Sequence, residues 1–289
     1  MKGAGLLALL IAVSTAAAET GPLLDVETTL DPKTGVNRFD AVLLRDGAAI
    51  RRVATSDWIR PQVTGYAQAR APIVVALGVP AGPDVPITPG RPTFDGLPKT
   101  PLPGADRAHL VTDDLANSML LNIADDLPGL TLHFPGGLVN GPGPDILIAE
   151  ASLAAGRVSG ACPGVPSPGA DAMVARLANG AESTLAPEAF VDVGPAGPQL
   201  NHGTRALGAT DFRIETLDAL ASLEMRPIAS LDYFKVYAAT LDLADMGVAE
   251  GQAIETLILS SSGKKVQTAG GPRLCWTADP ILVVGLPAP

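Results

Sequence analysis

The three histidines are the first candidates for acid–base chemistry in this chain. His109, His133 and His202 stand far apart, and no HExxH, GxSxG or HxH pattern accompanies them. His133 alternates with apolar residues and is expected to face solvent from a strand. His202 lies in a loop-like, Gly/Pro-rich stretch and is the better candidate for a ligand-binding or catalytic role. A Ser/His/Asp triad would have to be assembled around it from distant segments.

Carboxylates are more numerous, but their spacing does not favour a glycosidase. Asp145 and Glu150 lie five residues apart on one expected strand, so their side chains should project to opposite faces. Two catalytic carboxylates must flank the same glycosidic bond. Solvated surface carboxylates are the simpler interpretation.

A structural calcium ion is the one cofactor that the carboxylates suggest. The possible oxygen donors are Asp145, Glu150, Asp242 and Asp245. No EF-hand loop or nonapeptide repeat gives them a ligand spacing. The alternative is that these aspartates cap turns, as aspartate commonly does.

Aromatic side chains could supply a stacking surface for a sugar. They make up only 4% of the chain. Trp58 is the candidate that we single out, together with His202, as a ligand-binding residue. An aromatic residue in or near a strand is more often part of the core.

The two cysteines, Cys162 and Cys275, are expected to form a disulfide. In an oxidising compartment, a lone pair of cysteines is usually joined. A bridge closing so long a loop could stabilise the fold by about 4–5 kcal/mol on the chain-entropy model. Two unpaired buried thiols are the alternative, and a metal site is the weaker one because no histidine is near either cysteine.

The stretch 130–151 is the element around which the rest of the chain is organised. Leu130, Leu132 and Phe134 alternate with polar residues, as in a strand with one buried face. Residues 140–144, Asn-Gly-Pro-Gly-Pro, form a rigid turn because the prolines lack an N–H and the glycines permit positive φ. An apolar run follows and ends on Glu150. The sequence predicts a strand–turn–strand unit.

Other short apolar runs separated by turn residues predict further strands. The clearest occupy residues 39–49, 71–79, 234–243, 253–260 and 279–287, with a hairpin turn at Asp46-Gly47. Residues 172–178 are compatible with one or two helical turns, and residues 194–208 read as a loop. This spacing predicts an all-β fold, a β-sandwich or jelly roll with long Pro/Gly-rich loops.

Composition limits the partners. Thirty acidic and twenty basic residues give a net charge of −10, which disfavours nucleic acid and anionic membranes. No later segment is apolar enough over sufficient length to span a membrane.

The N-terminus predicts export. Lys2, the apolar run 6–13 and Ala16-Ala17-Ala18 form the three parts of a signal peptide, 1–18, cleaved before Glu19. The mature protein is therefore expected to be secreted or periplasmic. It would comprise an N-terminal β segment (19–80), a Pro-rich connection (81–104) and a β-sandwich domain (105–289).

Three pieces of sequence together resemble a known family. They are Val139-Asn-Gly-Pro-Gly-Pro-Asp145 leading into a strand, residues 241–251 and the apolar strand 279–287. The set resembles exported bacterial β-sandwich domains of cell-surface proteins, many of which carry a PEP-CTERM-type sorting tail. Ala149 stands where that family usually has Phe, and no such tail is present. The resemblance implies a jelly-roll fold and an extracellular location, with no assigned activity.

These observations favour an exported, non-catalytic β-sandwich protein that binds a ligand or an envelope component, carbohydrate being one candidate. The competing hypothesis is a secreted hydrolase with a loop-built site around His202. The two are distinguished by whether His202 lies within hydrogen-bond reach of a serine or carboxylate in a concave pocket.

Overall fold

The computed structural model describes the strand-forming parts of the chain. These are residues 23–30, 37–46, 49–66, 74–76, 100–101, 119–121, 129–153, 169–195, 201–206, 224–230, 234–262, 265–268, 271–274 and 278–289. Within them the regular elements are strands and the short 3₁₀ helices η1 (Thr55–Asp57), η4 (Pro187–Ala189) and η5 (Leu243–Met246). The all-β class predicted from the sequence is confirmed.

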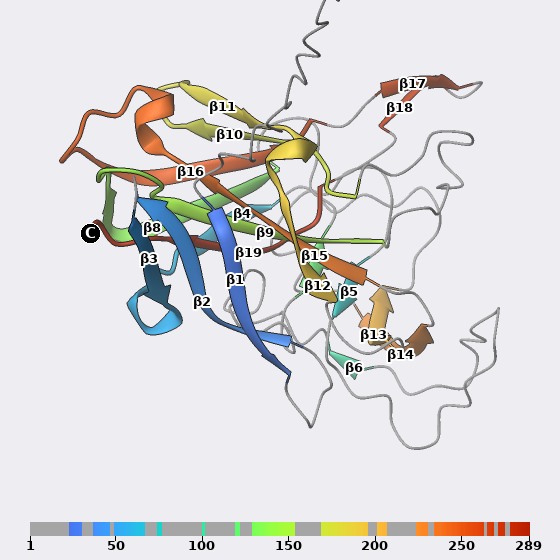
Figure 1. The fold of residues 1–289 in the computed structure, drawn as a ribbon. Coiled ribbons are helices and arrows are strands. Elements are labelled where there is room, and N and C mark those ends of the chain that lie inside the picture. Colours follow the sequence, from blue (N-terminus) through green and yellow to red (C-terminus); the bar gives the residue numbers. More distant parts are fainter. Residues whose placement is uncertain are drawn as a thin grey trace, which may run out of the picture.

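Three antiparallel sheets contain most of the described core (Figure 1). The outer sheet has the order β1-β2-β3, with β1 Leu23–Leu30, β2 Asn37–Asp46 and β3 Ala49–Ala54. The central sheet has the order β12-β15-β9-β19, with β9 Ile146–Leu153, β12 Val191–Pro195, β15 Phe234–Leu241 and β19 Pro280–Gly285. The large sheet has the order β11-β10-β16-β8-β4, with β4 Gln62–Tyr66, β8 Leu130–Val139, β10 Met173–Leu177, β11 Glu182–Leu185 and β16 Ala253–Ser261.

Two smaller sheets complete the described strands. One has the order β6-β14-β13-β5-β7, with β5 Val74–Ala76, β6 Thr100–Pro101, β7 Met119–Leu121, β13 Asn201–Ala206 and β14 Glu224–Ser230. The other pairs β17 (Lys265–Thr268) with β18 (Gly271–Leu274).

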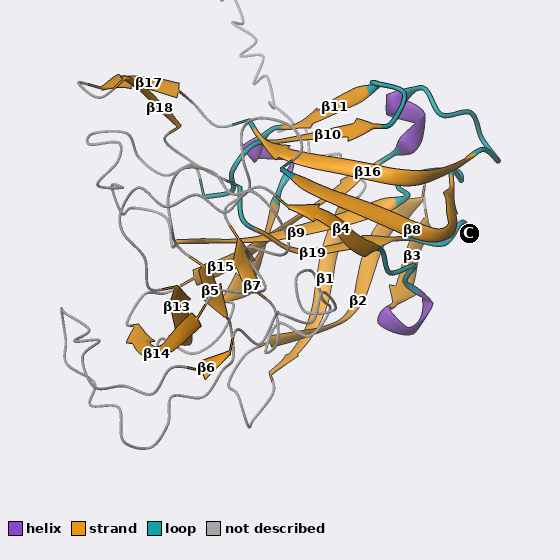
Figure 2. Ribbon diagram, turned by 180° about the vertical axis from the view of Figure 1, so that it is seen from behind, coloured by secondary structure: helices purple, strands orange, loops and turns teal. Residues whose placement is uncertain are grey.

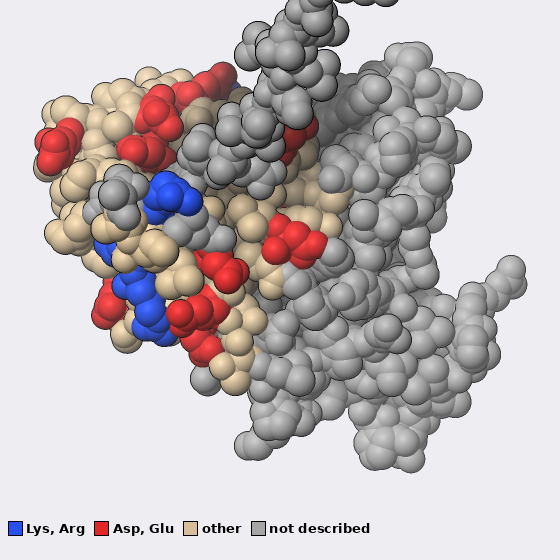
Figure 3. Space-filling view, viewed as in Figure 1, with Lys and Arg blue, Asp and Glu red and all other residues tan. Residues whose placement is uncertain are grey.

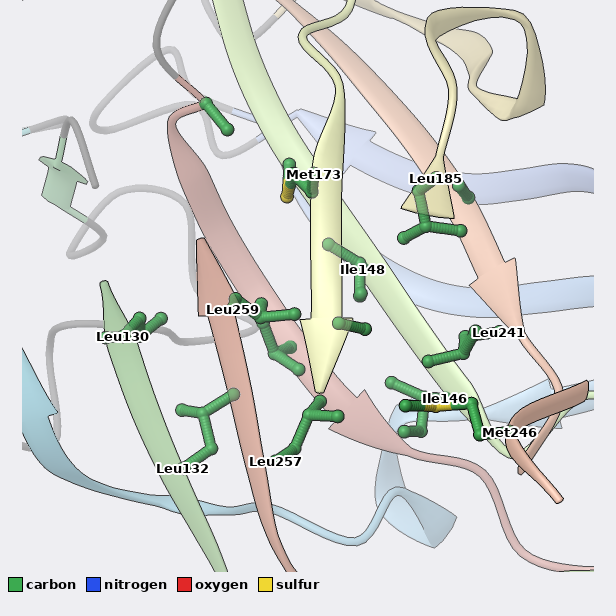
Figure 4. Close-up of a cluster of buried hydrophobic side chains, with 14 of the residues drawn as sticks. Leu130, Leu132, Ile146, Ile148, Met173, Leu185, Leu241, Met246, Leu257 and Leu259 are labelled. Carbon is green, nitrogen blue, oxygen red and sulfur yellow. The ribbon is translucent and has the colours of Figure 1, made fainter. Parts of the chain in front are cut away.

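The strand β9 is buried on both faces and explains how the three main sheets are stacked. Ile146 and Ile148 belong to the hydrophobic core shared with the large sheet, whereas Leu147 and Ala149 belong to the core shared with the outer sheet. This alternation is the two-residue period of a strand. Figure 4 shows Ile148 near Leu259 of β16 and Ile146 near Met246 of η5, with Leu130 and Leu132 of β8 farther away, beyond β16. The order of layers is therefore large sheet, central sheet, outer sheet.

Figure 2, seen from behind, has the strands of the large sheet in front and β1 and β2 on the far side, in agreement with this order. A sandwich or a jelly roll has two layers. In the described residues a third sheet covers the face of the central sheet that a sandwich would expose to solvent.

Several local predictions are confirmed and two are wrong. The hairpin after Asp46 is confirmed, since Asp46 pairs with Ala49. Residues 172–178 are not helical: they contain β10, in which Met173, Ala175 and Leu177 are buried and alternate with half-buried residues. The predicted loop 194–208 contains β13. All of the Pro-rich connection except Thr100 and Pro101 lies outside the described residues.

Candidate functional site

Trp58, predicted as a sugar-stacking residue, lies in the core instead of on an exposed surface. Its side chain is 4% exposed and belongs to the hydrophobic cluster between the outer and central sheets. Its ring centroid is 6.3 Å from that of Phe39, at an interplanar angle of 54°. Trp58 is therefore a core residue, which is the alternative given above for an aromatic residue near a strand.

The structure places His202 on a strand. It lies in β13, paired in register with Ala229 of β14. The backbone around it is therefore extended, and the expectation of a loop at this position is wrong. The side chain of His202 is not among those described, and His109, Cys162 and Cys275 lie outside the described residues. The predicted disulfide stays a prediction.

The turn 140–145 is a point where three distant segments are joined, and we call it the Asp145 hub. The carboxylate of Asp145 accepts hydrogen bonds from Gly141 N at Oδ1 (2.8 Å) and from Leu243 N at Oδ2 (2.9 Å). Its backbone N–H donates to Leu241 O (3.0 Å), and its carbonyl accepts from Leu286 N (2.7 Å). One buried aspartate thus connects the turn, the start of η5 and the end of β19.

Asn140 extends this hub toward the start of β16. Its Nδ2 donates to Val248 O (2.7 Å), and its backbone groups pair with Gln252 O and Gly251 N. The three sequence pieces that carry the family resemblance therefore meet in space. Gly143 allows the turn because its φ of +81° is a backbone conformation that favours glycine.

The strands explain why these residues meet. β8 ends in the large sheet and β9 begins in the central sheet, so the 140–145 turn carries the chain across the core. The turn leaves backbone N–H groups at buried strand ends without ladder partners, and such groups require acceptors. A carboxylate can accept from two of them at once. Burial raises the pKa of Asp145, and the N–H donors of Gly141 and Leu243 oppose that rise.

The other predicted calcium donors do not gather around Asp145 as a ligand set. Asp242 caps η5, because its Oδ1 accepts a hydrogen bond from Ala244 N (2.8 Å). This is the turn-capping role given above as the alternative to a calcium ligand. Asp245 is exposed on the same 3₁₀ helix. Glu150 lies on β9, five residues after Asp145, and has different hydrogen-bond partners. No group of three potential ligands is present in the described part of the chain. We identify none of these residues as a metal ligand, and calcium stays a prediction.

Glu150 forms a second buried polar junction, with Asp171. Glu150 is 0% exposed and Asp171 is 6% exposed. The backbone N–H of Asp171 donates to Glu150 Oε1. Burial, followed by the charge of Asp171, raises the pKa of Glu150 well above its usual value, and burial raises the pKa of Asp171 to about 7.

Asp171 is the functional candidate that sequence reasoning missed. It follows Gly169 and Ala170 in a turn-rich segment, where an aspartate is expected to face solvent. No spacing relates it to Glu150, since the two lie on segments of different sheets. Only a prediction of the correct strand at Met173–Leu177 could have indicated that the residues before it approach the core.

Comparisons with known proteins give no further identification. No family model, no curated protein and no solved structure matches the chain. None of the helices that the structure describes is long and apolar enough to cross a lipid bilayer. What the geometry itself defines is an all-β protein in which buried Asn and Asp side chains join the ends of strands.

Proposed function

We propose that this protein is an exported, non-catalytic β-rich module that binds a glycan of the cell envelope. The observation that carries the non-catalytic part of the proposal is the Asp145 hub. The side chains of Asn140 and Asp145 belong to the most distinctive of the motifs that carry the family resemblance. They hydrogen-bond to backbone N–H and C=O groups. A residue whose two carboxylate oxygens each accept from an amide is suited to holding strand ends and poorly suited to acid–base catalysis.

Surface charge supports an uncharged ligand over a polyanion. Figure 3 shows acidic side chains spread over the described part of one face, with basic side chains among them. A protein with a net charge of −10 is repelled by a polyanion, whereas neutral sugars need hydrogen bonds and apolar contact. The signal-peptide pattern supports a location in which such glycans are met.

Export is tested by fractionating cells that express the full chain with a C-terminal tag. We expect the tagged protein in the periplasm or the medium, with an intact mass that corresponds to a first residue of Glu19. Recovery in the cytoplasm with Met1 retained would overturn the export part of the proposal.

Binding is tested separately, with purified protein and isolated envelope polysaccharides. We expect saturable binding that is weakened in His202→Ala, without release of new reducing ends by either protein. The matched control is His133→Ala, since His133 is half-buried on β8 and its Nδ1 lies 3.1 Å from Glu255 O. Release of reducing ends that is lost in His202→Ala and kept in His133→Ala would instead establish the hydrolase.

A further inference from the structure

Glu150 and Asp171 form a carboxyl pair across the core between two sheets. Glu150 belongs to β9 of the central sheet, and Asp171 lies two residues before β10 of the large sheet. The hydrogen bond from Asp171 N to Glu150 Oε1 joins them directly. Both side chains are more than nine-tenths buried.

One oxygen of each carboxyl group has no hydrogen-bond partner. Glu150 Oε2 and Asp171 Oδ1 are both buried, and neither has a hydrogen-bond donor. Ionised carboxylates can only accept, so two ionised groups would leave both oxygens unsatisfied. A protonated carboxyl group is itself a donor, and two carboxyl groups that share a site cannot easily both ionise.

We infer that Glu150 and Asp171 share a proton, held on Glu150 Oε2 and donated to Asp171 Oδ1, which makes this junction between the sheets sensitive to pH. The proton supplies the donor that both orphaned oxygens lack. It also removes one of two negative charges from the core, where no water is available to solvate them. Loss of the proton leaves two like charges at the junction and weakens it.

The groups that face the pair from neighbouring strands do not offset this charge. Asp279, just before β19, donates a backbone hydrogen bond to Glu150, but its carboxylate raises the pKa of Glu150 further. Tyr237 of β15 is the register partner of Glu150. Tyr66 of β4 interacts electrostatically with Asp279. Ser261 at the end of β16 accepts from Ala278 N (2.7 Å). The charged groups acting on Glu150 are thus both acidic.

The direction of the pH dependence follows from the raised pKa of each group. Between an ordinary carboxyl pKa of about 4 and the value of about 7 for Asp171, the folded protein keeps protons that the unfolded chain has released. The contribution of Asp171 is therefore complete below about pH 4 and is lost as the pH rises through about 7. Glu150, whose pKa is raised well above its usual value, adds a loss in the same direction. Each such proton changes the folding equilibrium constant by up to about tenfold per pH unit.

The experiment is urea unfolding of the full chain between pH 5 and pH 8 for the wild type, Glu150→Gln and Glu188→Gln. A glutamine at 150 is neutral at every pH and offers an N–H donor to Asp171. We expect Glu150→Gln to gain stability relative to the wild type as the pH rises, by up to about tenfold in equilibrium constant per unit. Glu188, exposed on η4, is the matched control and should follow the wild type.

Parallel pH profiles for the wild type and Glu150→Gln would overturn the inference. Infrared spectroscopy of the wild type provides a second test that needs no variant: the carbonyl stretch of a protonated carboxylic acid should persist at pH 7, and its absence would overturn the inference. Stabilisation of the wild type by calcium at pH 7, absent in Glu150→Gln, would show that a cation occupies the pair and would equally overturn it.

Discussion

Asp145, just before β9, and Glu150, within β9, are both buried carboxyl groups, and their partners give them different chemistry. Asp145 meets two backbone N–H donors, one at each oxygen, so its ionised form is satisfied by hydrogen bonds. Glu150 accepts at Oε1 and leaves Oε2 without a donor. Burial raises the pKa of both groups, but only Asp145 has a donor at each oxygen to oppose the rise.

Asp145→Asn tests the hub at the scale of one residue. Asparagine can accept at one position only, and its NH₂ group would face a backbone N–H donor at the other. We expect a loss of about 1–3 kcal/mol in the free energy of unfolding, measured by urea denaturation. Asp245→Asn, on the exposed side of η5, should change stability by less than about 0.5 kcal/mol. Equal effects of the two substitutions would contradict the role given to Asp145.

At the scale of elements, β9 decides the architecture because it contributes to two cores. Its apolar run is continuous, Ile146 to Ala149, where a strand with one solvent face would alternate. β19 has the same character, with Val283 in one core and Leu282 and Val284 in the other. A sheet built around such strands needs cover on both faces, and the outer sheet supplies the second cover.

Leu147→Ala and Ile148→Ala test this three-layer arrangement together. The two side chains point to opposite faces of β9, and both are 0% exposed. We expect each substitution to lower the free energy of unfolding by about 2–5 kcal/mol, since each leaves a cavity in a different core. In a two-layer sandwich only one of them would be costly. The control is Ile50→Ala on β3, where the side chain is 66% exposed and little change is expected.

In the whole molecule, two buried polar junctions connect the central sheet to segments outside it. The Asp145 hub joins the 140–145 turn, η5 and β19, and the Glu150 junction joins β9 to the segments that precede β10 and β19. Those two segments are the ones that contain Cys162 and Cys275. Asp171 lies nine residues after Cys162 and Asp279 lies four residues after Cys275, and both hydrogen-bond to Glu150 through their backbones.

The disulfide between Cys162 and Cys275 stays a prediction from the sequence, and it can be tested directly. We expect a reducing agent, or the double variant Cys162→Ser/Cys275→Ser, to lower the melting temperature, because the bridge would constrain a loop of more than a hundred residues. The loss should be about 4–5 kcal/mol at most. Intact mass of the oxidised protein without reductant checks the bond itself, and two free thiols in that sample would end the prediction.

Sequence alone predicts the all-β class, the strands β8, β9, β15, β16 and β19, and the turn between β8 and β9. These follow from local causes: the two-residue period of a half-buried strand, the continuous apolar run of a fully buried one, and prolines and glycines that exclude other backbone conformations. Local pattern is insufficient for β10, since residues 172–178 are also compatible with helical turns, although Met173, Ala175 and Leu177 alternate as in a strand.

What each face of a strand is buried against depends on the packing of distant sheets. An apolar side chain requires cover, but its own sequence does not specify which distant sheet provides it, so neither the third layer nor the burial of Trp58 followed from the pattern. The pairing of Glu150 with Asp171 has the same origin. Hydrogen bonds of buried polar groups are satisfied by whichever segments the packing of the sheets brings together, and that packing depends on contacts far apart in the chain.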